Sequence, residues 1–222
     1  LQLSDVAVPA IDDDRILIRV KATSVNPADL YMMLGKPWLV RAENGVRRPK
    51  NPVQGSDGAG IVEAVGANVT EFSPGDEVWG SFRGAYAEYA SALEKNLVHK
   101  PANVSFEKAA VVPIAGITAL QGLRDKGGLQ PGQRVLINGA SGGVGTFAVM
   151  IAKAMGAHVT GVCSTANADL VRSIGADEVI DYTTTDYTKG TTPYDVILDN
   201  VTTHGIRANR TVMTPTGRWV QA

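Results

Sequence analysis

Hydrophobic residues in the first half of the chain form short runs that alternate with turn residues. The runs have the length and the β-branched or aromatic content of strands, and turn signals such as Asn26-Pro27 separate them. We predict strands at residues 15–20, 60–65, 77–79, 85–90 and 97–99. Because short strands joined by turns pair mainly with their neighbours, this half is predicted to be a mostly antiparallel β domain with irregular loops.

A longer apolar stretch follows at residues 106–123, and its length indicates a helix. Ser105 stands directly before it, where an N-cap side chain accepts a hydrogen bond from the first turn. We therefore predict one helix over residues 106–123. A domain boundary is predicted just before it, which divides the chain into residues 1–104 and 105–222.

After residue 130, apolar strands alternate with helices. Strands are predicted at residues 134–138, 159–163, 178–182, 195–198 and 217–220, and helices at 144–155 and 168–174. Continuous apolar strands separated by helices form a parallel sheet that is covered on both faces. This half is therefore predicted to be a doubly wound α/β domain. It is expected to be incomplete, because a full sheet of this kind has one strand more.

Composition excludes few protein classes. The chain has 222 residues, 21 basic and 22 acidic side chains and a net charge of -1, which argues against nucleic acid or an anionic membrane as a partner. No apolar run reaches the roughly 18 residues of a membrane span. The single cysteine excludes an internal disulfide and suits a reducing cytoplasm, where we expect the protein.

The segment NGASGGVG (residues 138–145) joins a predicted strand to a predicted helix. Glycines there allow a tight turn and a close approach to a pyrophosphate, whose charge is favoured at a helix N-terminus. A tight turn without a ligand is the alternative interpretation. The strand before, the helix after and the second strand beyond it favour a dinucleotide site. We predict that the cofactor contacts Ala140, Ser141, Gly142, Gly143 and Val144.

The second strand of this unit ends at Cys163, where such folds usually place an acid that holds the adenosine ribose. An aspartate would repel a 2′-phosphate by roughly 4 kcal/mol per unit charge pair at ~4 Å and an effective dielectric near 20. Cysteine removes that repulsion. Hydroxyl donors on Ser164, Thr165 and Tyr182 can each contribute about 1.5–3 kcal/mol to holding the phosphate, so we predict NADPH as the cofactor. In the alternative interpretation, Cys163 is a small buried residue and Ser164 and Thr165 cap the next helix.

Four ordered motifs carry a family resemblance: VNPADLY (residues 25–31), GSDGAGIVEAVG (55–66), PGDEVWG (74–80) and the glycine-rich segment within 132–153. Together they resemble the medium-chain dehydrogenase/reductase superfamily, specifically its zinc-free quinone oxidoreductase (ζ-crystallin-like) branch. The resemblance covers essentially the whole chain. It implies a GroES-like β domain followed by a Rossmann domain, with the active site in the cleft between them. It also implies further strands before Leu1 and after Val220, so we expect a chain truncated at both ends and a homodimer of the full-length protein.

Zinc-dependent relatives resemble this chain but carry a metal-binding cysteine where Asn26 stands, and a His-Glu pair where Ser56 and Asp57 stand. With one cysteine and three histidines, this chain cannot assemble a Cys/His site of that kind, and we predict no metal. Asp57 is interpreted as a structural remnant rather than an acid. A basic residue often present in the branch to pair with the 2′-phosphate is replaced near Ala166.

The resemblance implies that Asn26 and Tyr31 line the substrate cleft. Asn26 would bind the acceptor carbonyl or the nicotinamide ribose, and Tyr31 would donate a proton or hydrogen bond. The alternatives are a loop turn at Asn26 and a packed aromatic on a short helix at Tyr31. Thr118 resembles a cofactor-contacting position, and Asn200 follows a parallel strand at the sheet edge that binds ligands.

Four basic residues form a loop that could border the predicted cleft, and the favoured interpretation is a solvated loop without that role. Its members are Arg41, Arg47, Arg48 and Lys50.

These features predict an NADPH-dependent, zinc-independent oxidoreductase that transfers hydride to small quinones or activated enones. Quinones and enones suit a nicotinamide enzyme without metal, because their oxygen takes up charge with only a hydrogen bond or proton to help. Two alternatives stay open. One is an enoyl-thioester reductase, and the other is a non-catalytic NADPH-binding or structural protein.

Overall fold

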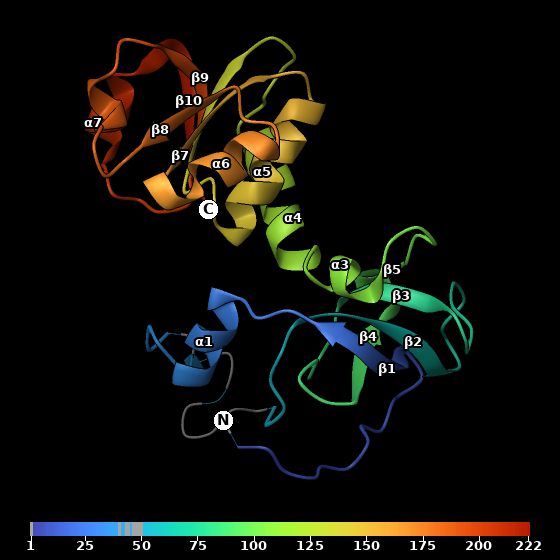
Figure 1. The fold of residues 1–222 in the computed structure, drawn as a ribbon. Coiled ribbons are helices and arrows are strands. Elements are labelled where there is room, and N and C mark those ends of the chain that lie inside the picture. The colour runs from blue at the N-terminus through green and yellow to red at the C-terminus, as the bar shows by residue number, and fades with distance from the viewer. Residues whose placement is uncertain (1, 40, 43–44, 46–50) are drawn as a thin grey trace. The chain divides into compact units, whose positions relative to one another are not determined.

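The computed structural model describes residues 2–39, 41–42, 45 and 51–222 (Figure 1). The chain divides into two compact units, Leu1–Ile114 and Ala115–Ala222. The first unit contains a five-stranded sheet in the order β4-β1-β2-β3-β5, and every neighbouring pair is antiparallel. Its strands are β1 (Arg15–Thr23), β2 (Asp57–Val65), β3 (Glu77–Ser81), β4 (Tyr89–Leu93) and β5 (Leu97–His99). The predicted antiparallel β domain is confirmed.

Alternation along β1 builds the core of this unit. Ile16 and Ile18 are fully buried and pack with Val62, Phe72 and Val78. Successive strand residues point to opposite faces, so Leu17, between the two isoleucines, faces away from this core.

The strand predicted at residues 85–90 is misplaced, because β4 begins only at Tyr89 and continues to Leu93. The backbone N–H groups of Ala85 and Tyr86 donate instead to the carbonyls of Gly55 and Gln54. This segment is therefore a loop that pairs with the residues before β2, and its apolar composition misled the prediction.

The single helix predicted at residues 106–123 is also wrong. The structure has α3 (Phe106–Ala110), then a break, then α4 (Pro113–Leu120), which continues as a π-helical turn over Gln121–Lys126. Pro113 explains the break, since proline lacks the N–H of a helix interior and is well tolerated in a first turn. Ser105 is the N-cap of α3, as predicted, and accepts from the N–H of Lys108 at 3.3 Å.

The division into units follows from the packing of α3. Ala109 and Ala110 of this helix are buried in a cluster with Ala59 of β2. The predicted boundary lies before α3, whereas the compact first unit includes it and ends at Ile114.

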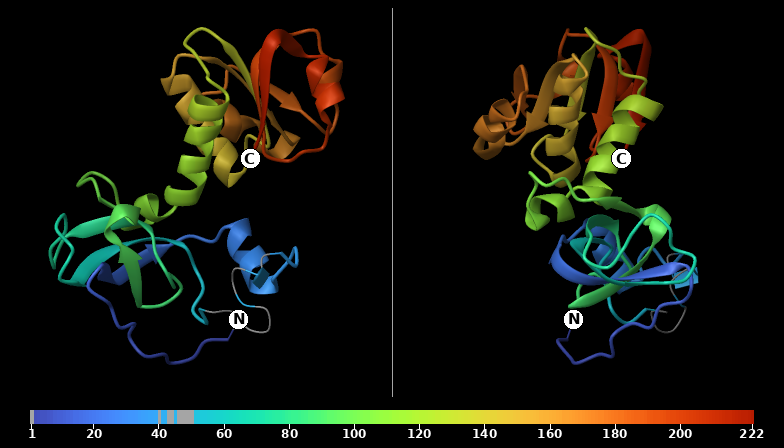
Figure 2. Two further views of the ribbon diagram at one scale, coloured as in Figure 1. Left: turned by 180° about the vertical axis from the view of Figure 1, so that it is seen from behind. Right: turned by 90° about the vertical axis from the view of Figure 1, so that its right-hand side faces the viewer.

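The second unit contains a parallel five-stranded sheet in the order β10-β9-β6-β7-β8 (Figures 1 and 2). Its strands are β6 (Arg134–Asn138), β7 (His158–Cys163), β8 (Glu178–Asp181), β9 (Tyr194–Asp199) and β10 (Met213–Gln221). Its helices are α5 (Gly143–Ala154), α6 (Ala168–Ser173) and α7 (Ile206–Arg210), and α4 belongs to it from Ala115 onward. The strand order runs outward from β6 in both directions, which confirms the predicted doubly wound sheet.

Alternate residues of β6 divide the core of this unit into two clusters. Val135 and Ile137 pack in one cluster with Val149 of α5, and Leu136 packs in another with Tyr187. None of the described helices is long and apolar enough to cross a membrane.

Candidate functional site

Asn26 in the first unit lies directly before α1 (Pro27–Leu34) and begins this helix. Its backbone N–H donates to the Asp29 carboxylate at 2.8 Å, and the backbone N–H of Asp29 donates back to the Asn26 carbonyl at 3.0 Å. This reciprocal arrangement resembles a capping box, with Pro27 at the first helical position. Gly35, with φ of 57°, ends the helix in the left-handed conformation. Local sequence therefore fixes the backbone of Asn26.

The side chain of Asn26 is fixed as well. Its Nδ2 donates to the hydroxyl of Ser24 and to Oδ2 of Asp57, both at 3.1 Å. An amide NH2 group has two hydrogens, so both are used. What Asn26 still offers a ligand is the acceptor Oδ1. Of the two predicted roles, this favours contact with a ribose hydroxyl over donation to an acceptor carbonyl.

Asp57 is fully buried at the start of β2 and is the centre of this network. Besides Asn26, its Oδ2 accepts from the Ser24 hydroxyl at 3.3 Å and from the backbone N–H of Ile114 at 3.0 Å. Ile114 lies in the first turn of α4, whose N–H groups lack carbonyl partners within the helix. The other oxygen, Oδ1, is buried and has no hydrogen-bond partner among the described residues.

Burial raises the pKa of Asp57, and the charge of nearby Asp29 adds to the rise. The hydrogen bonds from Ile114, Asn26 and Ser24 lower it and offset the rise only in part. The motif GSDGAG marked Asp57 in the sequence, but its interpretation as a remnant gave no sign of this network.

Asp29 is a second buried carboxylate of the first unit. It accepts from the phenol of Tyr86 at 2.9 Å and from the hydroxyl of Ser56 at 3.1 Å. Burial, together with the bond to Asp29, raises the pKa of Tyr86 to about 12. Asp29 and Ser56 also line a pocket of about 350 Å³ within this unit. Neither Asp29 nor Tyr86 was predicted as a site residue, although Asp29 stands at the capping-box position of VNPADLY.

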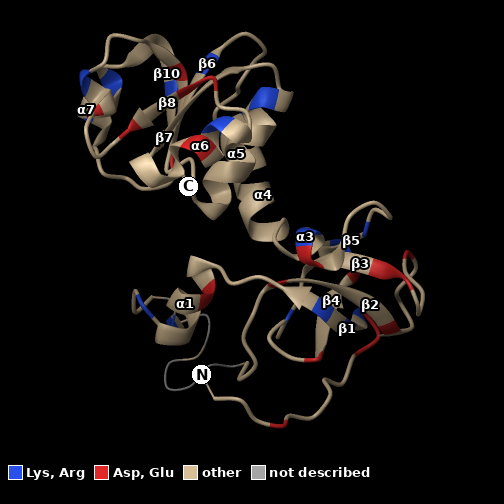
Figure 3. Cartoon of the chain, viewed as in Figure 1, with Lys and Arg blue, Asp and Glu red and all other residues tan. Residues whose placement is uncertain are grey.

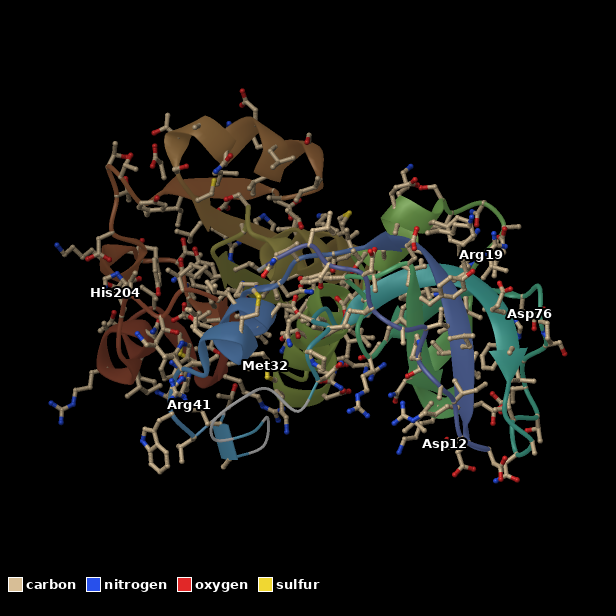
Figure 4. All side chains as sticks on the ribbon, turned by 90° about the horizontal axis from the view of Figure 1, so that it is seen from below. Asp12, Arg19, Met32, Arg41, Asp76 and His204 are labelled. Carbon is tan, nitrogen blue, oxygen red and sulfur yellow. The ribbon has the colours of Figure 1, made fainter. Side chains whose placement is uncertain are left out.

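Tyr31 does not join this network. Its side chain is 54% exposed on α1 and makes no hydrogen bond among the described residues, so the phenol is available to a ligand. Arg41, a member of the predicted basic loop that is labelled in Figure 4, donates its Nε to the carbonyl of Gly35 at 3.1 Å. The other three basic residues of that loop, Arg47, Arg48 and Lys50, lie outside the described residues.

The glycine-rich turn of the second unit connects β6 to α5. A Cβ at Gly145 would collide with the carbonyl oxygen of Gly139, so a glycine there is required for the turn to close. At Gly143 a Cβ would meet nothing within 4 Å, and both Gly142 and Gly143 are exposed. Packing therefore does not explain these two glycines.

The bare backbone at Gly142 and Gly143 fits a phosphate group. The helix begins at Gly143, and the N–H groups of its first turn have no carbonyl partner within the helix. Ser141 is half-buried beside them. Ala140 is fully buried and can offer a ligand only its backbone, whereas Val144 is half-buried and packs on the core.

Cys163 ends β7 as a buried residue. Burial raises the pKa of its thiol, and the charge of Asp181 adds to the rise. Ser164 is the N-cap residue of a short 3-10 turn, Thr165–Asn167, and its hydroxyl accepts from Nδ2 of Asn167 at 3.3 Å. This agrees with the alternative interpretation of Cys163 and in part with that of Ser164, which keeps its own hydroxyl proton.

Thr165 and Tyr182 differ in what they can offer. The Thr165 hydroxyl donates to the carboxylate of Asp181, the last residue of β8. The Tyr182 side chain is 63% exposed and remains available. Asp181 was predicted only as part of a strand, and its position beside Thr165 was missed.

Asp199 is fully buried at the carboxyl end of β9. Its Oδ1 accepts from Nδ2 of Asn138 at 2.8 Å and from the backbone N–H groups of Val201 at 3.2 Å and Thr202 at 2.8 Å. Its Oδ2 accepts from the indole of Trp219 at 3.2 Å. The carboxylate thus holds together three strands and the turn after β9. Thr202 in that turn has φ of 59°, an uncommon value for a β-branched residue.

Asn200 follows β9, which pairs with β6 at the point where the strand order reverses, and in doubly wound sheets this edge binds ligands. Its Nδ2 donates to the carbonyl of Asn138 at 2.9 Å. Its Oδ1 is buried without a partner among the described residues, which fits a contact with a ligand that donates a hydrogen bond. Thr118, on α4, is half-buried, and no hydrogen bond of its side chain occurs among the described residues.

Metal ligands do not gather in the described part of the chain. No group of three or more His, Cys, Asp and Glu side chains is placed there to hold a metal ion.

Known protein families match both units. The family described as "Alcohol dehydrogenase GroES-like domain" matches residues 12–102, and the family described as "Zinc-binding dehydrogenase" matches residues 143–222. The predicted order of a GroES-like domain and a Rossmann domain is thereby confirmed.

Individual relatives are oxidoreductases. The chain is 40% identical over 208 residues to "NAD(P)H oxidoreductase RTN4IP1, mitochondrial" of Mus musculus, which covers 85% of this chain and 52% of the relative. It is 37% identical over 210 residues to "2-methylene-furan-3-one reductase" of Solanum lycopersicum, which covers 89% of this chain and 52% of the relative. The chain thus spans about half the length of the curated relatives it matches.

Solved structures of enzymes share the fold. The CurK enoyl reductase matches with a TM-score of 0.88 and 30% identity, over 99% of this chain and 68% of that one. A quinone oxidoreductase of Pseudomonas syringae pv. Tomato DC3000 matches with a TM-score of 0.84 and 32% identity, over 97% of this chain and 67% of that one. The Rossmann unit and these relatives imply a nicotinamide nucleotide cofactor. The chain belongs to the medium-chain dehydrogenase/reductase superfamily, in its quinone oxidoreductase branch.

Proposed function

We propose that the chain belongs to an NADPH-dependent, zinc-independent oxidoreductase that transfers hydride to small quinones or activated enones. The observation that carries this proposal is the hydrogen bonding of Asn26, Ser56 and Asp57. These positions match the metal ligands of zinc-dependent relatives. Here an amide and a hydroxyl replace the thiolate and the imidazole, and each donates to a buried carboxylate. That donor set suits a polar positioning network better than zinc.

A bound nicotinamide nucleotide would supply the hydride, and this chain's residues would position it. The exposed backbone of Gly142 and Gly143 would hold the pyrophosphate. Ser164 and Tyr182, whose hydroxyl protons are free to turn toward a ligand, would hold a 2′-phosphate. The buried Oδ1 of Asn200 would accept a hydrogen bond from the nicotinamide side.

Two residues of the first unit would act on the reacting groups. Asn26 presents an oriented Oδ1 and would accept from the nicotinamide ribose. Tyr31 presents an exposed phenol and would donate a hydrogen bond or proton to the acceptor oxygen. Neither role needs a metal to polarise the acceptor, because a quinone or enone is already electron-poor.

The names of relatives support the substrate class. The name 2-methylene-furan-3-one describes a methylene group next to a ring ketone, which is an activated enone. A structurally similar chain is named a quinone oxidoreductase. Both acceptors take hydride at carbon or oxygen while a conjugated oxygen gains charge.

The proposal extends to partners and location. We propose a small-molecule acceptor, no nucleic-acid or membrane partner, a cytoplasmic location, and a homodimer of the full-length protein. The net charge of -1 supports the proposed lack of a nucleic-acid or membrane partner. Figure 3 shows both signs of charge on each unit. The single cysteine supports a reducing compartment.

A substrate panel tests the proposed function. The chain should reduce small quinones or enones with NADPH, and a chelator should not change the rate. Alcohol oxidation that stops on chelation, without quinone or enone reduction, would refute the proposal. Faster reduction of a crotonyl thioester would select the enoyl-thioester alternative, and NADPH binding without any turnover would select the non-catalytic one.

Cofactor preference has its own test in Ser164→Asp. The new carboxylate would face the proposed 2′-phosphate, so NADPH binding should weaken far more than NADH binding. Equal losses for both nucleotides would mean that Ser164 does not face the phosphate.

A further inference from the structure

We propose that Asp181 is a specificity-determining residue that limits the preference of this chain for NADPH over NADH. Its carboxylate places a fixed negative charge beside the loop proposed to bind the 2′-phosphate. The inference rests on the proposed function, because it assumes that a nicotinamide nucleotide occupies the second unit.

The sheet register places Asp181 at the relevant edge. β7 and β8 are parallel neighbours, and Cys163 pairs with Asp181 as the last residue of each strand. The acid that is absent from the end of β7 is thus present at the end of the adjacent strand. The carboxylate reaches the loop after β7, where it contacts the hydroxyl of Thr165.

Three hydrogen bonds fix the orientation of this carboxylate. Oδ2 accepts from the Thr165 hydroxyl, and Oδ1 accepts from the backbone N–H of Thr183 at 2.9 Å and from its hydroxyl at 2.7 Å. Hydrogen bonds from Thr165 and Thr183 lower the pKa of Asp181, so the group is ionised at neutral pH. An ionised carboxylate held from both oxygens cannot turn away from a bound anion.

The same bonds change what Thr165 offers. A threonine hydroxyl has one hydrogen, and Thr165 has directed it to Asp181. Toward a phosphate it presents lone pairs. A ribose 2′-hydroxyl near this loop can donate to the carboxylate, whereas a 2′-phosphate is repelled by it. The arrangement therefore favours the unphosphorylated ribose and opposes the contacts proposed for Ser164 and Tyr182.

Among the described residues, no Lys or Arg forms an ion pair with Asp181. Arg172 of α6 is paired with Asp169 at 3.0 Å. Ala166, in the loop itself, carries no charge. The carboxylate of Asp181 is therefore the charged group that meets the ribose end of the ligand from β8.

Asp181→Asn tests the proposal, with Asp169→Asn as the matched control. Both changes remove one negative charge, but Asp169 is fully exposed on α6 and contacts Arg172 rather than the loop. The readout is the ratio of the dissociation constants for NADH and NADPH, measured by equilibrium titration, together with the affinity for 2′,5′-ADP. Asp181→Asn should shift the ratio toward NADPH by about tenfold and tighten 2′,5′-ADP binding, since the repulsion is lost. Asp169→Asn should change the ratio less than about twofold, because Asp169 and the Arg172 that it releases are both exposed to solvent, which screens their charges.

An unchanged ratio in a folded Asp181→Asn protein, or an equal shift in the control, would overturn the proposal. If Asp181→Asn fails to fold, Asp181→Ser removes the same charge and is held to the same expectation. Thr165→Val keeps the charge and removes only the donor. A shift toward NADPH as large as that of Asp181→Asn would assign the effect to loop geometry and refute a role for charge. A wild-type chain that binds neither nucleotide would refute the proposed function as well, whereas binding with an unmoved ratio refutes only the role of Asp181.

Discussion

Each unit buries a carboxylate that holds an asparagine, and the two carboxylates are satisfied very differently. Asp199 of the second unit uses both oxygens, which together accept from Asn138, Trp219 and two backbone N–H groups. Asp57 of the first unit concentrates three donors on Oδ2 and leaves Oδ1 buried without one among the described residues. A buried carboxylate whose two oxygens both accept hydrogen bonds stabilises the fold. A buried carboxylate with one oxygen that lacks a donor is costly to keep ionised, and it therefore marks a candidate functional site.

The largest expected difference is in folding stability after Asp→Asn substitution. In Asp199→Asn the new NH2 group must face donors that need an acceptor, whichever way the amide turns. We expect a loss of about 2–4 kcal/mol in the free energy of unfolding. In Asp57→Asn the amide oxygen keeps the three donors and the NH2 takes the place of Oδ1, so the loss should stay within about 1 kcal/mol. Urea unfolding of both variants at pH 7 measures the difference, and equal losses would contradict the comparison.

Removing the asparagines should separate stability from activity. Asn138→Ala takes one donor from Asp199 inside the sheet, where both residues are buried, and should cost about 2–3 kcal/mol. Asn26→Ala leaves two donors to the carboxylate of Asp57, and Asn26 itself is only half-buried. The free energy of unfolding should therefore fall by about 1 kcal/mol. Since Asn26 is proposed to hold the nicotinamide ribose, its loss should lower kcat/KM for quinone reduction by about tenfold or more. If Asn26→Ala keeps full activity, its amide is structural only.

Whether the sequence predicts a feature depends on how far apart along the chain the residues that form it lie. The parallel sheet and the glycine turn follow from local patterns, namely strand runs, helix periodicity and glycines at fixed spacing. The capping of α1 is also local, since Asn26 and Asp29 are three residues apart. The break at Pro113 was readable from the sequence, because proline rarely continues a helix.

The carboxylate networks were not readable in the same way. Tyr86 and Asp29 are 57 residues apart, and so are Ile114 and Asp57. No periodicity relates positions joined only by folding. The strand predicted at residues 85–90 failed for the same reason, because the segment before β2 takes up its backbone N–H groups. In the sequence, Asp57 and Asp199 are both acids in strand-like segments. Only the hydrogen-bond donors around each carboxylate distinguish them.

The raised pKa of Asp57 predicts that the stability of the chain depends on pH. The folded-state pKa lies above the ordinary value of 3.8, so between the two values the folded chain holds a proton that the unfolded chain has lost. The contribution of Asp57 to stability therefore falls as pH rises from about 4 toward neutrality. Asp57→Asn removes this loss, so the variant should gain stability relative to wild type between pH 4 and pH 7. Urea unfolding at both pH values measures the gain, and parallel curves for the two proteins would show that Asp57 does not titrate in this range.

The smallest expected effect sharpens the same comparison. Ser24→Ala removes the weakest of the three donors to Oδ2, at 3.3 Å, and one acceptor of the Asn26 amide, so it should cost about 0.5–1 kcal/mol. Because that hydrogen bond lowers the pKa of Asp57, its loss should move the pH-dependent fall in stability to higher pH. Thr23→Val is the control, since Thr23 donates to the backbone carbonyl of Asp57 at 2.7 Å and leaves the carboxylate untouched. The control should lower stability equally at every pH. If both variants shift the pH profile alike, the carboxylate of Asp57 is not the group that titrates. The unpartnered Oδ1 of Asp57 would then mark a functional site no more than the fully hydrogen-bonded carboxylate of Asp199 does.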